Sequence, residues 1–126
     1  MPLLIHMKTL EANQLDQFRG GSEDFFKHSI NHRIIYTAGA RHVFQAGEAY
    51  WLLDEIALDN AFNRRVKLEP FQVWKLTVDE MHIGLLTCED GNGNEVFAKR
   101  LDYTDFPLPE LVLWCCDGTI LLPCEY

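Results

Sequence analysis

Hydrophobic and polar positions follow a helical period most clearly over residues 48–63. Polar side chains recur at steps of seven, four and four residues: Glu48, Glu55, Asp59 and Asn63. The apolar side of the same segment consists of Ala49, Leu53, Ile56, Ala57 and Ala61. Two such opposed stripes predict an amphipathic helix from Glu48 to Asn63. Directly after it come Arg64, Arg65 and Lys67, which we expect to complement the negative end of the helix dipole.

Shorter helices are predicted in the N-terminal part of the chain. Residues 11–18 place Leu15 and Phe18 three positions apart, and Gly20-Gly21 favours a helix end there. A second short helix is predicted to begin at Ser22, because its hydroxyl can accept from the exposed amides of the first turn. His28 then falls near the opposite end, where a partial positive charge is favoured.

The next segment combines a strand and a helix. Residues 33–36 are predicted to form a brief strand, and the pairing of Ile34-Ile35 is left open. Thr37 is typical of a helix cap, so Ala38 to Ala46 is predicted to be helical and to end at Gly47. A hairpin through Ala38-Gly39 is the alternative.

The rest of the chain alternates as β-strands do. Strands are predicted over residues 71–78, 83–88, 95–101, 111–116 and 119–123, with turn-forming Asp, Gly, Asn and Pro residues between them. Asp117-Gly118 is the signature of a two-residue hairpin, which sets Cys116 opposite Thr119 and Trp114 opposite Leu121. We therefore expect an α+β fold, in which short N-terminal helices and one longer helix pack on a C-terminal antiparallel β-meander of about five strands.

Both faces of the last predicted hairpin are apolar. One face consists of Leu111, Leu113, Cys115, Ile120 and Leu122, and the other of Val112, Trp114, Cys116 and Leu121. A sheet that is solvated on one side alternates more cleanly than this. An N-terminal helix or a second subunit is therefore expected to cover the second face, and Val112, Trp114 and Leu121 are the interface candidates.

Length and charge limit the classes of protein. A chain of 126 residues fits a single domain, residues 1–126. The net charge is −8, and no basic residue follows Arg100. A polyanion would be repelled by that last quarter of the chain, so we expect no binding to nucleic acid or to a membrane.

The first residues and the cysteines point to a compartment. The opening segment lacks the basic start, long apolar run and cleavage site of a secretory leader, and no stretch is long and apolar enough to span a membrane. The four cysteines, Cys88, Cys115, Cys116 and Cys124, are expected to be reduced structural thiols. We expect a cytoplasmic protein.

The spacing of two histidines indicates at most part of a metal site. His28 and His32 are four residues apart and would share a helix face, which is half of a zinc site; Cys88 and Asp90 could be brought near by the fold. No third ligand lies nearby in sequence, so capping and surface roles are the favoured interpretation. Phosphate-binding glycine loops and nucleophile-elbow motifs are absent from the sequence, and no cofactor is expected.

Several segments, taken in order, resemble a family of short bacterial and phage proteins defined only as a domain of unknown function. The segments are residues 15–18, 22–28, 36–37, 49–57, 71–76, 86–94, 103–108 and 121–126. Cys124 stands where the family pattern has Ser, which argues against an essential thiol there. The resemblance implies one complete domain and brings no activity or catalytic residues.

Three functions are compatible with these observations. The favoured hypothesis is a non-catalytic module that binds another protein or itself, with Trp51, Trp74 and Trp114 as candidate anchors. A small enzyme or metal-binding protein that uses His28 and His32 is the alternative. A further alternative is an acidic inhibitor of a basic partner, in a phage-related setting.

Overall fold

The computed structural model describes residues 10–19 and 24–126. The predicted second helix is wrong where it can be tested: Ser22 lies outside the described residues, and β1 (Phe25–Lys27) is a strand. The aromatic side chains favour this, since the Phe26 and Tyr36 rings stack at 5.7 Å across β1 and β2 (Ile35–Thr37). His28 therefore follows a strand and does not end a helix.

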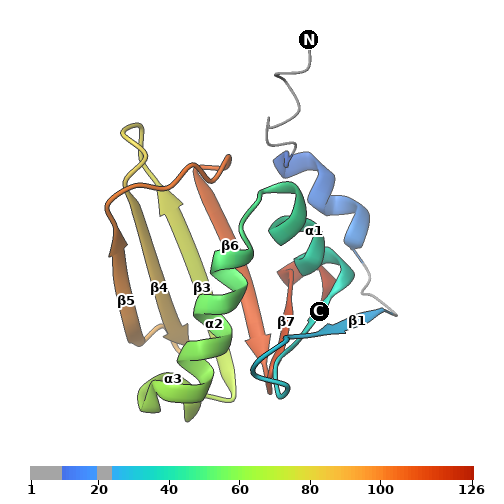
Figure 1. Ribbon diagram of the computed structural model, residues 1–126, viewed down its shortest axis with the longest axis vertical. Helices are drawn as coiled ribbons and strands as arrows, with labels where there is room; N and C mark the ends of the chain where they lie inside the picture. Colours follow the sequence, from blue (N-terminus) through green and yellow to red (C-terminus); the bar gives the residue numbers. More distant parts are fainter. Residues whose placement is uncertain (1–9, 20–23) are drawn as a thin grey trace.

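Seven strands form one mixed sheet in the order β1-β2-β7-β6-β3-β4-β5 (Figure 1). The remaining strands are β3 (Phe71–Val78), β4 (Gly84–Asp90), β5 (Glu95–Leu101), β6 (Glu110–Cys116) and β7 (Thr119–Leu121). β2 pairs parallel with β7 and antiparallel with β1, which answers the open question about Ile34-Ile35. The fold is thus α+β, with more strands than expected.

The expected meander order is wrong for β6. This strand pairs with β3, on the side away from β4, and leaves β5 at the edge of the sheet. The connection after β5 carries buried Thr104 and Phe106 and is tied to the turn after β3 through the Thr104 N–H, which donates to His82 O at 2.8 Å. Charged side chains suit β5 to an edge, and the two apolar faces of β6 suit it to a central position.

The predicted hairpin register is confirmed: Cys116 pairs with Thr119 and Trp114 with Leu121. Asp117 (φ 49°) and Gly118 (φ 89°) both adopt positive φ, as a two-residue hairpin turn requires. A Cβ on Gly118 would lie 2.6 Å from Arg33 O, so glycine also permits the close approach of the loop before β2.

Three α-helices of the described chain accompany the sheet. The first, α1 (Ala38–Ala46), shows that this segment is a helix and not the alternative hairpin through Ala38-Gly39. Thr37 Oγ1 accepts from Ala40 N at 3.1 Å, and Gly47 N donates to Val43 O, so both predicted ends are confirmed. Before it, residues Ala12–Phe18 form a 3₁₀ helix, η2, in place of the α-helix that the spacing suggests. A short η3 (Pro123–Glu125) ends the chain.

The long predicted helix is α2 (Tyr50–Phe62). The basic residues after α2 were expected to lie at its negative end. They instead form a separate turn of helix, α3 (Arg64–Lys67). The reason is Asn63, whose Oδ1 accepts from Arg65 N and Val66 N at 3.1 and 3.4 Å and so starts a new helix.

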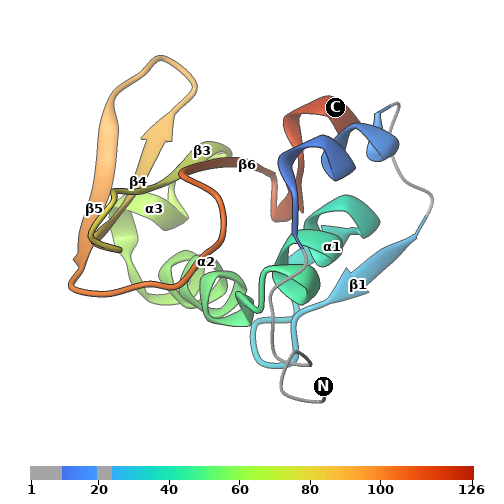
Figure 2. The ribbon, with the colours of Figure 1, turned by 90° about the horizontal axis from the view of Figure 1, so that it is seen from above.

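The core lies between the helices and one face of the sheet. α2 and α3 lie on one side of β3, β4 and β6 (Figures 1 and 2). Accordingly Gln72, Trp74 and Leu76 of β3 are buried, whereas their neighbours on the strand are half-buried. No helix of the described chain lies over the opposite face of β3, β4 and β5, which we call the open face. Among the described residues no helix is long and apolar enough to cross a membrane.

Candidate functional site

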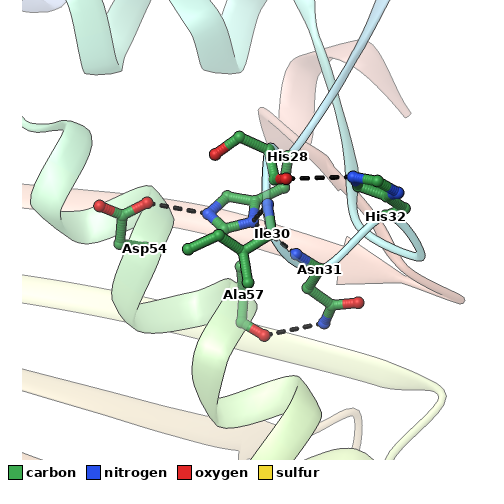
Figure 3. A network of polar contacts seen from close by, with 7 residues as sticks. His28, Ile30, Asn31, His32, Asp54 and Ala57 are labelled. Atoms are coloured by element: carbon green, nitrogen blue, oxygen red, sulfur yellow. Dashed lines mark hydrogen bonds and ion pairs between the residues drawn. The ribbon is translucent and has the colours of Figure 1, made fainter.

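His28 is the most buried histidine of the described chain, with 2 % of its surface exposed. Its Nε2 lies 2.8 Å from Asp54 Oδ1 on α2 (Figure 3). Its Nδ1 accepts two backbone N–H groups, from Ile30 at 3.1 Å and from Asn31 at 2.9 Å. An imidazole nitrogen that accepts carries no proton, so Nε2–H donates to Asp54. Both nitrogens are thereby occupied, which leaves His28 no lone pair for a metal or for proton abstraction.

The other metal candidates are not brought to His28. His32 lies in the same turn, but its Nε2 lies 3.0 Å from the backbone O of Ser29, and it shares no helix face with His28 (Figure 3). Cys88 is fully buried in the core and Asp90 ends β4. No cluster of three or more His, Cys, Asp or Glu within residues 10–19 and 24–126 could hold a metal ion.

All four cysteines are free thiols. Burial raises the pKa of Cys88 and of Cys115 to about 12, and burial also raises the pKa of Cys116. Cys124 is half-buried, and its Sγ donates to Leu15 O at 3.6 Å. Since the thiolate is the reactive form, the buried thiols are poor nucleophiles.

A buried amide pair joins α2 to β3, and sequence reasoning missed it. Gln72, 2 % exposed, and Asn60 exchange two hydrogen bonds between their side chains, at 2.8 and 3.1 Å. Gln72 Nε2 also donates to Val66 O and Glu69 O, and its Oε1 accepts from Trp74 Nε1 at 2.9 Å. The only available signal was a glutamine at an inward position of an otherwise apolar strand.

The buried carboxylate of Glu125 closes the N-terminus of α1, and sequence reasoning missed this contact too. Its oxygens accept from Thr37 Oγ1 at 2.6 Å, Leu122 N at 2.8 Å and Gly39 N at 3.2 Å. A Cβ on Gly39 would lie 2.6 Å from Glu125 Oε1, so glycine is what lets the carboxylate approach. A negative charge at this end of a helix is stabilised by the dipole.

Two carboxyl groups of α2, those of Glu55 and Asp59, lie near Lys99 of β5. Lys99 Nζ donates to Glu55 Oε1 at 2.8 Å, while Asp59 Oδ2 is buried with no hydrogen-bond partner among the described residues. Burial, followed by the neighbouring Glu55, raises the pKa of Asp59 to about 7. Burial opposes the shift at Glu55, but hydrogen bonds from Asp59 and Lys99 lower the pKa of that group. Between the lowered pKa of Glu55 and the pKa of about 7 of Asp59, Asp59 is protonated and Glu55 is ionised.

A hollow of about 590 Å³ lies between the turn before β2, the ends of α2 and α3, and the β6–β7 hairpin. It is lined by Asn31, Arg33, Ile34, Asn60, Ala61, Lys67, Leu68, Glu69, Pro70, Gln72, Asp117 and Gly118. The amide groups that reach it are engaged, since Asn31 Nδ2 donates to Ala57 O and Asn60 binds Gln72. Two cations, Arg33 and Lys67, and two carboxylates, Glu69 and Asp117, leave the lining without net charge. The lining contains no serine, threonine, cysteine or histidine.

The interface candidates lie around the end of the open face. Trp114 is half-buried between Phe71 and Tyr126, with ring centroids 5.3 and 5.4 Å away. Val112 is also half-buried on this face, whereas Leu121 is 7 % exposed. The structure brings Val112 and Trp114 to one surface. Leu121, which pairs with Trp114 across the hairpin, is buried and adds little to the exposed area.

Taken together, the fold is an α+β protein in which His28, Gln72 and Glu125 are engaged in internal hydrogen bonds, whereas Asp59 Oδ2 is buried without one among the described residues. The chain belongs to DUF6876, a family of unknown function, whose model matches residues 9–126. No curated protein and no solved structure matches the chain.

Proposed function

We propose that this protein is a non-catalytic interaction module whose open face binds a second copy of the chain. The observation that carries the proposal is the uncovered sheet surface that includes Val73, Val112 and Trp114, with Leu85 46 % exposed. The buried polar groups support it from the other side. The side chains of His28, Gln72 and Glu125 are each engaged in internal hydrogen bonds, so they offer no free catalytic group.

Charge along the strands favours a second copy as the occupant. The ladder aligns Glu110, Thr77, Leu85 and Arg100 in one row across four strands of the open face. Two copies can stack with their open faces together about a two-fold axis that runs parallel to the strands, midway between β3 and β4. This axis sets Glu110 of each copy opposite Arg100 of the other. The adjacent row sets Val112 opposite Ala98. Such an interface is self-complementary, as a two-fold dimer requires, and two sheets stack in this way about 10 Å apart.

The experiment is a charge exchange read by native mass spectrometry and light scattering over a range of concentrations. Glu110→Arg alone and Arg100→Glu alone are expected to weaken the dimer, because each sets like charges opposite one another. The double variant restores opposite charges and is expected to recover it. Both sites are exposed, so the fold is preserved.

Trp114→Glu provides the second test. It is expected to give a folded monomer, checked by circular dichroism and urea unfolding. A wild-type chain that stays monomeric at the highest concentrations tested would contradict the proposed function. A double variant no better than either single one would contradict the proposed axis.

We also propose a cytoplasmic location, which the four free thiols support.

A further inference from the structure

The C-terminal half of the outer face of α2 is apolar and exposed. Leu58 and Phe62 are four residues apart on one helix face and are 36 % and 83 % exposed. Ile30, 72 % exposed, lies beside α2 at the level of Asp54 and Ala57 (Figure 3). Asp54, one turn before Leu58 on the same face, is exposed as well, so the apolar part of this face is its C-terminal half. We call Ile30, Leu58 and Phe62 the outer stripe.

The charges around the outer stripe are predominantly positive. Arg64 and Arg65 follow Phe62 after Asn63, both are exposed, and no carboxylate of the described residues forms an ion pair with either. Arg65 donates to the backbone carbonyl of Glu95, which holds its side chain along the edge of β5. This cationic end is exceptional in a chain of net charge −8.

The carboxylates that share this surface are already engaged. Asp54 accepts from His28 and Glu55 accepts from Lys99. Asp59 lies beneath them and holds a proton up to a pH of about 7. The hydrogen bond from neutral His28 leaves the negative charge of Asp54 in place, yet no carboxylate of the described residues forms an ion pair with Arg64 or Arg65, so these two cations lack an internal counterpart. A second copy is a poor occupant for the same reason, because its α2 would present the same cations and the same engaged carboxylates.

We propose that the outer stripe and the adjacent Arg64 and Arg65 dock an acidic amphipathic helix of another protein. Apolar residues spaced by one turn on α2 match the i, i+4, i+7 anchors of such a helix, which packs with its ridges between those of α2. Acidic residues on the flank of the partner helix face the two guanidinium groups, which bind carboxylates in a bidentate manner. The surface is separate from the open face, so this docking does not depend on dimer formation.

The test uses the full chain and a labelled 18-residue helical peptide with leucines on one face and glutamates on the other. Fluorescence anisotropy is expected to show binding that weakens as salt is added. Phe62→Ser and Arg64→Glu/Arg65→Glu are each expected to weaken binding about tenfold or more, as loss of an anchor or of paired charges does. Met81→Ser and Arg100→Glu are matched controls, since both residues are exposed and lie far along the chain from the outer stripe. Both should leave binding unchanged, as should Trp114→Glu.

Several results would overturn the docking proposal. One is equal or tighter binding of the same peptide with lysine in place of each glutamate. Another is binding that Phe62→Ser leaves intact. Sedimentation of the protein with phosphatidylglycerol vesicles would identify an anionic membrane as the occupant instead. Rapid disulfide linkage of a Phe62→Cys variant into dimers, with no such linkage for Met81→Cys, would identify a second copy.

Discussion

His28 Nε2 donates to Asp54 Oδ1 over 2.8 Å and fixes the turn after β1 against α2. The two partners differ in burial, since 2 % of the His28 side chain and 59 % of the Asp54 side chain are exposed. His28→Ala leaves the amides of Ile30 and Asn31 without their acceptor and is expected to cost about 2–4 kcal/mol of unfolding free energy. Asp54→Ala removes an exposed partner and is expected to cost less than about 1 kcal/mol.

Urea unfolding of the two variants checks this asymmetry. An equal cost for both would show that the hydrogen bond from Nε2 to Asp54, and not the acceptance of the two amides at Nδ1, holds the turn. His32→Ala is the matched control, because His32 lies in the same turn and is exposed. It is expected to change the unfolding free energy by less than about 0.5 kcal/mol.

Gly39 and Glu125 are expected to be coupled in stability. Glu125→Ala removes the acceptor at the start of α1 and should cost about 1–3 kcal/mol. Gly39→Ala forces the carboxylate out of its place, since the new Cβ would lie 2.6 Å from it, and should cost about 1–3 kcal/mol. In the Glu125→Ala background the clash is gone, and alanine is the better helix former.

A double-mutant cycle measured by thermal or urea unfolding tests this coupling. Gly39→Ala should become neutral or stabilising once Glu125 is alanine. Additive costs would contradict the close approach of the carboxylate to Gly39.

The local elements could be predicted where short-range chemistry decides them. Thr37 caps α1, Gly47 ends it, and Asp117-Gly118 sets the hairpin register, because each acts within a few residues. The position of β6 beside β3 could not be predicted in this way. It depends on whether the connection after β5 runs along the edge or back across the sheet, and buried Thr104 and Phe106 decide that only through contacts with distant residues.

The candidate site was harder to predict for the same reason. His28 was a candidate metal ligand because of its spacing to His32, but the partner of its side chain is Asp54, 26 residues away. Glu125 meets Thr37 across 88 residues. Polar contacts of this kind are formed by the tertiary fold, and no local pattern in the sequence indicates them.

Gln72 is expected to be the most sensitive polar position of the sheet. Gln72→Leu keeps the volume but leaves Trp74 Nε1, Asn60 and the carbonyl of Val66 without their partner. We expect a loss of about 2–4 kcal/mol. Lys75→Gln on the opposite face of β3 is the control, with a change below about 0.5 kcal/mol. Urea denaturation distinguishes the two, and a stabilised Gln72→Leu variant would show that the amide network opposes folding.

Thiol reactivity should follow burial. Cys116 and Cys124 are half-buried, whereas Cys88 and Cys115 are buried and burial raises the pKa of both to about 12. Two thiols should therefore react with a disulfide reagent at pH 8 in the native state, and the other two only on unfolding. Mass spectrometry of alkylated peptides assigns the sites. Early labelling of Cys88 would contradict the packing of β4 under α2.

Asp59 is expected to make stability fall as the pH rises. The pKa of Asp59 is raised from 3.8 to about 7 in the folded protein, first by burial and then by Glu55. Between these values the unfolded chain has lost a proton that the folded chain retains, so the free energy of unfolding decreases from about pH 4 to about pH 7 and then levels off. Glu55 acts in the opposite direction. Its lowered pKa stabilises the fold above its ordinary value of 4.5, and this contribution is lost on further acidification.

Asp59→Asn isolates this contribution, because asparagine resembles the protonated acid and does not titrate. The urea midpoint of the wild type should fall between pH 5 and pH 8, and the variant should lose less over the same interval. Histidines titrate in this range as well, but they do so in both proteins and cancel in the difference. The variant should therefore equal the wild type at about pH 4 and below, already exceed it at pH 5 and exceed it most at pH 8. Parallel curves for the two proteins would show that Asp59 ionises in the fold as readily as in the unfolded chain.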